Sequence, residues 1–519
     1  MRKNILQILL ILLVVSLVSG VFAQEEPRYG GDLIISLGSD PEHLNPALST
    51  GYPIAAATAD VYSALVWRDE EGEYRPDLAK SWEVSDDYLT YTFHLRDNVY
   101  WHDGEHFTSG DVKFSMEELL ADFHGRFDTA FQHVESITTP DDYTVIITLK
   151  SPYAPLLSLL TVFDAPILPQ HLFADGNPFE NPHTNNPIGT GPFQFKEWSR
   201  GDRIVLERFD NYFEDPAYLD RVIFRIIPDE PARTIAMETG EVDYTLGFYL
   251  PVADLDRLRN MPTLEYWQGI RIPALFFVFI NTDHPELGDV RVRQAIMHAI
   301  DRELLVDLAY DGLGHIGIGP LGAAFPMVYS ENADVGKLYP YDPAKAKSLL
   351  AEAGVSNLEL NIIFDSGRPA FKDSIEIMRS NLADVGITLT LEPMERSVMV
   401  ERVYEERSYA LSMQSFTSGG DPAIGYHRIY ASAKLGDMFV NATGYSNETV
   451  DRLFSVAAEV PTTEARAELY QEAVEILAAD VPVLILFEEE AVEVNNKDLR
   501  GLRQSLDVRD QMHRVWWAK

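Results

Sequence analysis

The sequence of 519 residues contains no cysteine. The absence of cysteine excludes disulfide bonds, thiolate metal ligands and a cysteine nucleophile. It also excludes a lipid anchor on an N-terminal cysteine, so we expect a secreted form of the chain to be freely soluble. An apolar content of 46% indicates that a packed hydrophobic interior supplies the stability.

Positive charge is scarce as well. The chain has 42 Lys and Arg residues against 81 Asp and Glu residues, which gives a formal net charge of −39. Phosphate backbones and anionic membrane surfaces repel such a protein, so we expect neither nucleic acid nor an anionic lipid surface as a partner. Attraction of a cationic ligand remains open. Because the acids are spread along the chain, a solvated acidic surface is the favoured interpretation.

Long hydrophobic runs are missing after the N-terminus. The run from Ile5 to Val18 follows Arg2 and Lys3, and a Val-Phe-Ala motif comes soon after it. This pattern predicts a cleavable secretory signal over residues 1–23, because a membrane span needs about 20 apolar residues. We expect a mature periplasmic protein that begins near residue 24.

Catalytic motifs are also absent. The sequence has no H-E-x-x-H, no G-x-S-x-G, no G-K-S/T and no cysteine nucleophile. An extracellular hydrolase is the competing class, but no residue pattern supports one. We therefore predict a binding protein without enzymatic activity and without a cofactor.

The most informative stretch that is present runs from Leu95 to Glu118. It predicts a strand, a turn at Asp103-Gly104 and a helix with Thr108 as its N-cap and Asp111 three residues further on, as in a capping box. His102, Asp103, Glu105 and His106 are metal ligands by type. Because they lie in this structural corner, we expect no metal site here.

The same stretch resembles the signature of the family 5 extracellular solute-binding proteins. The matching residues are Arg96, Val99, Trp101-His102-Asp103-Gly104, Thr108 to Val112 and Ser115. Family-like motifs recur in Tyr74 to Trp82, Ile188 to Phe193, Val290 to Arg302 and Asp342 to Gly354. The resemblance covers nearly the whole chain after the signal segment.

The resemblance implies an α/β, two-lobed periplasmic-binding-protein fold (type II, cluster C), with an extra subdomain in lobe one and a hinge between the lobes. We expect lobe one over residues 24–270, with the extra subdomain at roughly 62–190. Lobe two is expected over 271–485, and 486–519 should return to lobe one. The resemblance also implies delivery of a ligand to an ABC permease and ATPase complex by a monomer.

Two stretches of lobe two are the first candidates for ligand contact. In dipeptide-binding members an Arg-Pro pair at the position of Arg368-Pro369 offers a guanidinium to the peptide carboxylate. A similar loop, W-x-x-D-x-x-D/E-P, pairs its first Asp with the ligand ammonium. Here Asp421 aligns with the second acid, Ser418 stands where the first Asp would be, and Phe416 lies near the Trp position.

This departure leaves the ligand class open. Either Asp421 or another acid replaces the missing charge, or the ligand has no ammonium group. In lobe one, the resemblance nominates Thr50 and Tyr52 as contacts. A peptide is the favoured ligand and an oligosaccharide the alternative, and a nickel complex also remains open. An oligosaccharide would use aromatic platforms, for which the candidates are Tyr52, Trp267, Phe371, Phe416 and Tyr426.

Overall fold

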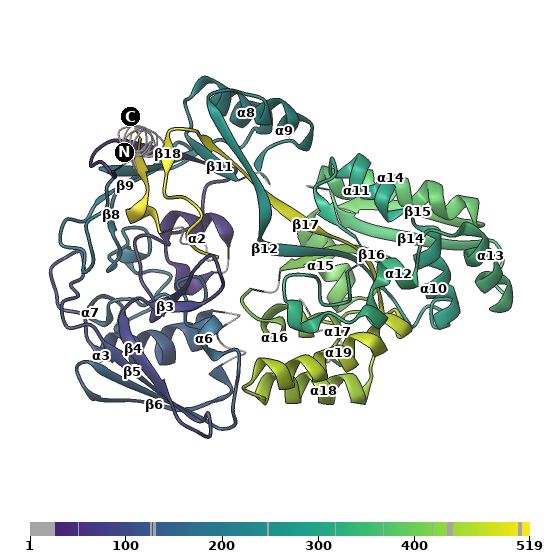
Figure 1. Ribbon diagram of the computed structural model, residues 1–519, viewed down its shortest axis with the longest axis horizontal. Helices are drawn as coiled ribbons and strands as arrows, with labels where there is room; N and C mark the ends of the chain where they lie inside the picture. Colours follow the sequence, from purple (N-terminus) through teal and green to yellow (C-terminus); the bar gives the residue numbers. More distant parts are fainter. Residues whose placement is uncertain are drawn as a thin grey trace, which may run out of the picture.

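The computed structural model describes residues 26–49, 51–124, 127, 131–246, 249–316, 318–366, 368–417, 419–432, 440–506 and 511–518. It shows two lobes joined by a pair of long strands (Figure 1). None of the helices in these ranges combines the length and the apolar composition needed to cross a bilayer.

One mixed sheet extends through both lobes. Its strands follow the order β15-β14-β16-β12-β17-β11-β1-β10-β9-β8, and β13 pairs with β17 outside this path. The strands in chain order are β1 (Asp32–Leu37), β8 (Phe193–Ser199), β9 (Arg203–Arg208), β10 (Arg221–Ile226), β11 (Tyr244–Leu246), β12 (Leu264–Ile280), β13 (Gly314–His315), β14 (Leu358–Asp365), β15 (Ile387–Met394), β16 (Leu411–Thr417) and β17 (Val483–Asn496).

Strands β12 and β17 connect the lobes. They pair antiparallel in two segments, Leu264–Gly269 with 491–496 and Ala274–Phe279 with 483–489, and their register shifts between Gly269 and Ala274. The apolar run Leu275 to Ile280, which by its composition is expected to be a buried strand, is the second half of the longer strand β12. Since the shift interrupts the ladder where the strands leave one lobe, it is the natural place for a hinge.

The buried apolar residues form separate clusters on the two sides of this register shift. One core cluster runs from Leu275 to Phe487 and defines lobe two. Another begins at Leu33 and includes Val515 near the C-terminus, so lobe one contains both ends of the described chain. A smaller cluster includes Met237 and Val494. The return to lobe one lies a few residues later on β17 than the expected boundary at 485.

Lobe one contains the predicted strand–turn–helix corner. Thr108 and Asp111 form the predicted capping box at the start of α3 (Ser109–Phe114), and a wider helical turn, Ser115–Leu120, continues it into α4 (Ala121–Phe123). Trp101 is fully buried under the turn. The neighbouring sheet has the order β4-β5-β7-β6, beside the hairpin β2-β3. Their bounds are β2 (Val66–Arg68), β3 (Tyr74–Pro76), β4 (Ala79–Val84), β5 (Thr90–Leu95), β6 (Val134–Asp141) and β7 (Thr144–Leu149).

The apolar stretch from Ile54 to Leu65 is expected from its sequence to form one helix, and the structure contains a shorter one. It forms α2 (Tyr52–Thr58) and ends where the carbonyl groups of Asp60 and Val61 turn away to accept backbone bonds from Phe193 and Gly191, at 3.1 and 2.8 Å. These long-range bonds compete with the next helical turn. The other described helices of lobe one are α6 (Leu156–Leu159), α7 (Gln170–Phe173), α8 (Glu230–Thr239) and α9 (Val252–Arg259).

Lobe two is an α/β layer structure. Strand β14 pairs parallel with both β15 and β16, as the strand–helix–strand order predicts. Aspartates 289, 301 and 342 cap α10, α11 and α13 by accepting backbone N–H groups. The apolar periodicity alone indicates a helix over 375–385, and α14 starts six residues before that range, because Pro369 occupies a first-turn position. The bounds are α10 (Val290–Ala299), α11 (Arg302–Ala309), α12 (Val335–Leu338), α13 (Pro343–Glu352), α14 (Pro369–Asp384), α15 (Arg396–Val400), α16 (Pro422–Gly425), α17 (His427–Tyr430), α18 (Glu448–Glu459) and α19 (Thr463–Asp480).

The C-terminal segment packs against lobe one. Strand β18 (Leu499–Arg500) pairs with β19 (Trp516–Trp517), and the Trp517 indole donates to the Asp32 carbonyl oxygen at 3.0 Å. In Figure 1 this segment is yellow and lies beside the start of the described chain.

Candidate ligand-binding site

The carboxyl ends of the parallel strands of lobe two meet at one edge of the sheet. Strand β14 ends at Asp365 and β16 ends at Thr417. Ala274 of β12 pairs with both Thr417 and Glu489, so the connecting strands enter lobe two at this same edge. Ligand sites of open α/β sheets lie at such edges, because the loops that follow the strands converge there. We therefore take this edge as the candidate site.

Arg368, which the family resemblance nominates as a ligand contact, lies at this edge. It occupies the N-cap position of α14, and its backbone N–H donates to the Asp365 carbonyl oxygen at 3.2 Å. Its guanidinium donates to the Ser415 hydroxyl at 2.6 Å and lies 5.0 Å from the centre of the Phe371 ring. These contacts from β16 and α14 hold an exposed cation in a fixed orientation.

A second cation lies close to Arg368. The guanidinium of Arg396, at the start of α15, is 3.9 Å from the Asp365 carboxylate. Asp365 thus lies beside Arg396, and its charge also acts on Arg368. Arginine binds a carboxylate through two parallel N–H bonds, which fixes the position as well as the charge of the bound group.

Asp421 is buried inside lobe two. Its two oxygens accept from the Arg466 guanidinium at 2.7 Å each, and one of them also accepts the Ala423 backbone N–H at 2.9 Å, which caps α16. Arg466 further donates to the Ala457 carbonyl oxygen. The Asp421 carboxylate is thus neutralised within the protein. It supports the loop that precedes it, and its charge is already satisfied by Arg466, which disfavours a direct contact with a ligand cation.

Phe416 also belongs to the interior. Its side chain is buried, and its ring meets the rings of Phe277 and Phe279 edge-on at 5.3 and 6.1 Å. Arg428 lies over the same ring at 4.4 Å. The strand alternation explains this placement: Phe416 points into the core, whereas its neighbour Ser415 presents a hydroxyl group to Arg368.

The lobe-one candidates are only partly described. Tyr52 begins α2, is half-buried and packs edge-on against Tyr249, with the ring centres 6.2 Å apart. Thr50 and Ser418 lie outside the described residues. The roles of all three in ligand contact stay predictions.

The loop that follows β16 reaches lobe one. A Cβ atom on Gly420 would overlap the guanidinium of Arg68 and would lie 3.0 Å from the Cβ of Ser158, both in lobe one. The Ala154 N–H donates to the Ala458 carbonyl oxygen at 2.7 Å, which adds a second contact between the lobes. Glycine at 420 therefore permits a close approach of the two lobes next to the candidate site.

Sequence reasoning missed Glu489 at the candidate site. This residue is half-buried and lies at the point where β17 leaves lobe two. Burial raises the pKa of its carboxyl group to about 7, and the positive charge of Arg368 acts against that rise. The available signal was the run of three glutamates, 488–490, directly after the apolar strand residues 483–487.

His102 stabilises the strand–turn–helix corner through hydrogen bonds to the backbone. His102 Nδ1 accepts the Gly189 N–H at 3.2 Å, and its Nε2 lies 3.0 Å from the Gly191 carbonyl oxygen. Burial lowers the pKa of His102 to about 4, so the ring is neutral at pH 7. Within the described ranges, no three His, Cys, Asp or Glu residues are grouped so that they could hold a metal ion.

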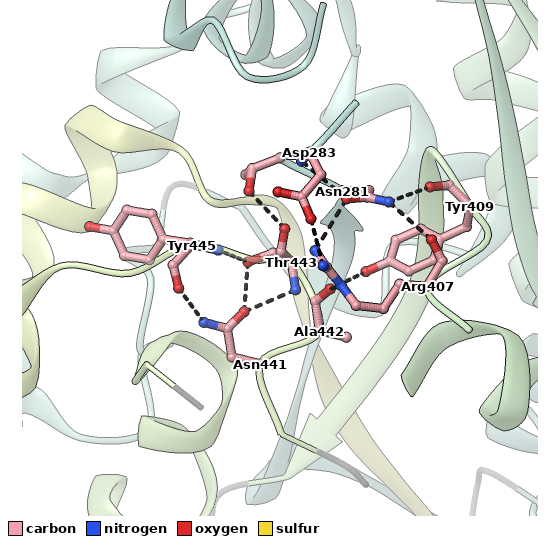
Figure 2. Close-up of polar contacts among 9 residues, drawn as sticks. Asn281, Asp283, Arg407, Tyr409, Asn441, Ala442, Thr443 and Tyr445 are labelled. Carbon is pink, nitrogen blue, oxygen red and sulfur yellow. Dashed lines mark hydrogen bonds and ion pairs between the residues drawn. The ribbon is translucent and has the colours of Figure 1, made fainter. Parts of the chain in front are cut away.

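A dense polar network marks the opposite edge of the lobe-two sheet (Figure 2). Asn281 follows the last residue of β12, and its amide donates to the carbonyl oxygens of Arg407 and Tyr409, just before β16 begins. Arg407 in turn donates to the carboxylate of Asp283 and the carbonyl oxygen of Ala442. This network ties together loops at the amino end of β16, so it is structural and lies away from the candidate site.

Two lobes around a paired-strand crossover, with the convergent polar groups at the carboxyl edge of a parallel sheet, define a solute-binding protein of the cluster C type. Residues 73–437 match the model of the bacterial extracellular solute-binding proteins, family 5, and the chain belongs to this family. The members of this family are solute-binding proteins and not enzymes.

Individual relatives cover nearly the whole chain. Heme-binding protein A of Haemophilus influenzae is 29% identical over 477 residues, 85% of this chain and 84% of that one. The dipeptide-binding protein of Escherichia coli is 28% identical over 501 residues, 90% and 91% of the two chains. The periplasmic binding protein DppA of Helicobacter pylori, in complex with the peptide STSA, superposes with a TM-score of 0.81 at 27% identity, over 95% of this chain and 99% of that one.

Proposed function

We propose that this protein is a periplasmic binding protein that captures a short peptide between its lobes and delivers it to an ABC permease and ATPase complex. The observation that carries the proposal is Arg368, held by Ser415 at the carboxyl edge of the lobe-two sheet. Among the described residues, the remaining N–H groups of its guanidinium have no protein acceptor. A ligand carboxylate would satisfy them with charge-assisted bonds.

The burial of the candidate aromatic platforms favours a peptide over an oligosaccharide. Of the five aromatic residues considered from the sequence, Phe371, Phe416 and Tyr426 are buried in lobe two, with at most 8% of each exposed. Only Tyr52 and Trp267 keep a partly accessible ring. A sugar site needs aromatic faces that the ligand can reach, so an oligosaccharide stays the second candidate.

The proposed mechanism is closure of the lobes about the register shift in β12 and β17. A ligand favours the closed form only through contacts that improve on closure. Arg368 and the loop of residues 415–421 would supply these contacts from lobe two, and Thr50 and Tyr52 from lobe one. The closed, loaded form would then be the one that the permease binds.

A ligand screen by thermal unfolding tests the proposal. The panel holds di- to pentapeptides, the same peptides with amidated C-termini, cello- and xylo-oligosaccharides, and nickel with a chelator. A ligand at 100 times its Kd stabilises the folded state by about 2.7 kcal/mol. Free peptides should raise the unfolding midpoint, and their C-terminal amides should do so less. A response to sugars or nickel alone would refute the peptide assignment.

We also propose that residues 1–23 are removed on export and that the mature protein is an unanchored monomer in the periplasm. Expression of the full chain in a Gram-negative host, followed by mass spectrometry of the periplasmic fraction, tests the cleavage site. A mature protein that retains residues 1–23, or one found in the membrane fraction, would contradict this proposal.

A further inference from the structure

Glu489 differs from its two neighbours in the contacts of its side chain. Glu488 is fully buried and accepts the Ala323 N–H at 2.7 Å. Glu490 contacts His315 and Gln268. The Glu489 carboxylate has no hydrogen-bond or ion-pair partner among the described residues, although the residue is half-buried. An acid in this position loses hydration and receives no hydrogen bond from the described residues in return.

The strand geometry places Glu489 on the same side of the sheet as Arg368. Side chains alternate along β17, so Glu489 shares a face with Phe487. Phe487 stacks on Phe276 with a centroid distance of 4.6 Å, and Phe276 contacts Phe371, the residue whose ring lies under the Arg368 guanidinium. The three stacked or edge-on rings thus form one apolar surface on this side of the sheet. Arg368 lies at one end of that surface and Glu489 lies near its other end.

Glu489 and Arg368 influence each other without forming an ion pair. The charge of Arg368 acts on the Glu489 carboxyl group, yet no nitrogen–oxygen distance of 4.0 Å or less joins them in the described part of the chain. Two opposite charges that face the same space but stay apart suit a ligand that carries both charges. Such a ligand would pair with each group and would replace the water that each loses on closure.

We propose that Glu489 binds a positively charged nitrogen of the ligand while Arg368 binds its carboxylate, so that the protein selects ligands carrying both groups. This inference rests on the proposed function and names its substrate class. Position 418 holds a serine where peptide-binding members have the aspartate that pairs with the ligand ammonium. In this protein Glu489 on β17 would supply that negative charge instead. The cationic group is an ammonium or guanidinium, either at the amino end of a short peptide or on a basic side chain.

The test uses the mature protein, its Glu489→Gln variant and the matched control Glu490→Gln, whose residue already has protein partners. Isothermal titration is carried out with Ala-Ala, N-acetyl-Ala-Ala, Ala-Lys and N-acetyl-Ala-Lys. These peptides share a carboxylate and differ in their positive groups. Replacing the acid by its amide keeps the shape and removes the charge.

Wild-type protein should bind the three peptides that carry a positive group (Ala-Ala, Ala-Lys and N-acetyl-Ala-Lys) more tightly than N-acetyl-Ala-Ala. The Glu489→Gln variant should lose at least tenfold in affinity for them and keep its affinity for N-acetyl-Ala-Ala, since a charge-assisted bond contributes about that factor. Glu490→Gln should behave as wild type. A loss confined to the free amino terminus assigns Glu489 to the α-ammonium group, and a loss confined to the lysine peptides assigns it to the side chain.

Equal affinity losses for all four peptides, or none, would overturn the role of Glu489 and leave the proposed function in place. If wild-type protein bound none of the four, the proposed function and this inference would fall together. Circular dichroism and the unfolding midpoint of each variant show whether an affinity loss reflects misfolding. A folded Glu489→Gln variant that kept the wild-type preference for cationic peptides would contradict the inference directly.

Discussion

Arg466 holds Asp421 by a two-point ion pair, with both nitrogen–oxygen distances at 2.7 Å and both side chains at most 8% exposed. The pair joins the loop after β16 to helix α19. An acid that resembles a ligand contact in the sequence therefore has its partner inside the protein. Its geometry fixes the path of residues 419–421, which approach lobe one.

Replacing Asp421 by asparagine should destabilise the protein by about 3–5 kcal/mol, because the buried Arg466 charge would be left without its counter-ion. The free energy of unfolding from denaturant titration measures this change. Asp175→Asn, at an exposed acid, is the control and should change stability by less than about 0.5 kcal/mol. An Asp421→Asn variant as stable as the control would show that the pair contributes nothing to the fold.

Arg368→Ala should weaken the binding of a carboxylate ligand by at least tenfold and leave a neutral sugar almost unaffected. The residue is exposed, and within the described ranges its side chain makes one hydrogen bond, to Ser415, so the fold should tolerate the change. Titration calorimetry with a peptide and its C-terminal amide separates charge recognition from general damage. Equal losses for the peptide and its amide would refute the assigned role.

Gly191→Ala should destabilise the protein by at least about 3 kcal/mol or prevent soluble folding. A Cβ atom at this position would overlap the carbonyl oxygen of Asp60, a backbone atom that cannot rotate away. Gly319→Ala is the matched control, because its Cβ would lie 3.6 Å from the Ala333 carbonyl oxygen, at ordinary contact distance. Similar unfolding midpoints for both variants would contradict this account of the residues 188–193 segment.

Acidification should destabilise the protein through His102. The pKa of this residue falls from 6.5 in the unfolded chain to about 4 in the folded protein. Below pH 6.5 the unfolded state therefore binds a proton that the folded state excludes, so stability is complete above this pH and is lost as the pH falls toward 4. The loss is at most about 3 kcal/mol.

The measurement for His102 is the free energy of unfolding at pH 7 and at pH 4, for wild type and His102→Gln. The variant is expected to be less stable at pH 7, since it loses the contacts to the backbone of Gly189 and Gly191. Its change between the two pH values should be smaller than that of wild type. Identical changes in the two proteins would assign the pH dependence to other groups.

Local sequence determined much of this fold. The Thr108–Asp111 capping box, the aspartate caps of the lobe-two helices and the order of strands and helices all depend on neighbouring residues, and the structure contains each of them. The long, ordered motifs also identified the family. The sequence predicts a helix that continues beyond the observed end of α2. The helix stops earlier because carbonyl groups just after its C-terminus accept hydrogen bonds from a segment about 130 residues away.

In the candidate site, too, some residues were indicated by the sequence and others were placed only by tertiary packing. Arg368 was nominated through the Arg-Pro pair that the family resemblance supplies, and the structure places it between the end of β14 and the start of α14, at the carboxyl edge where ligand sites of such sheets lie. That Asp421 is neutralised by Arg466, and that Phe416 points into the core, was decided by tertiary packing. Glu489 came to the site edge through the pairing of β17 with β12, strands that are more than 200 residues apart in the chain. Local propensities carry no information on such pairings, and only the folded chain brings those side chains together.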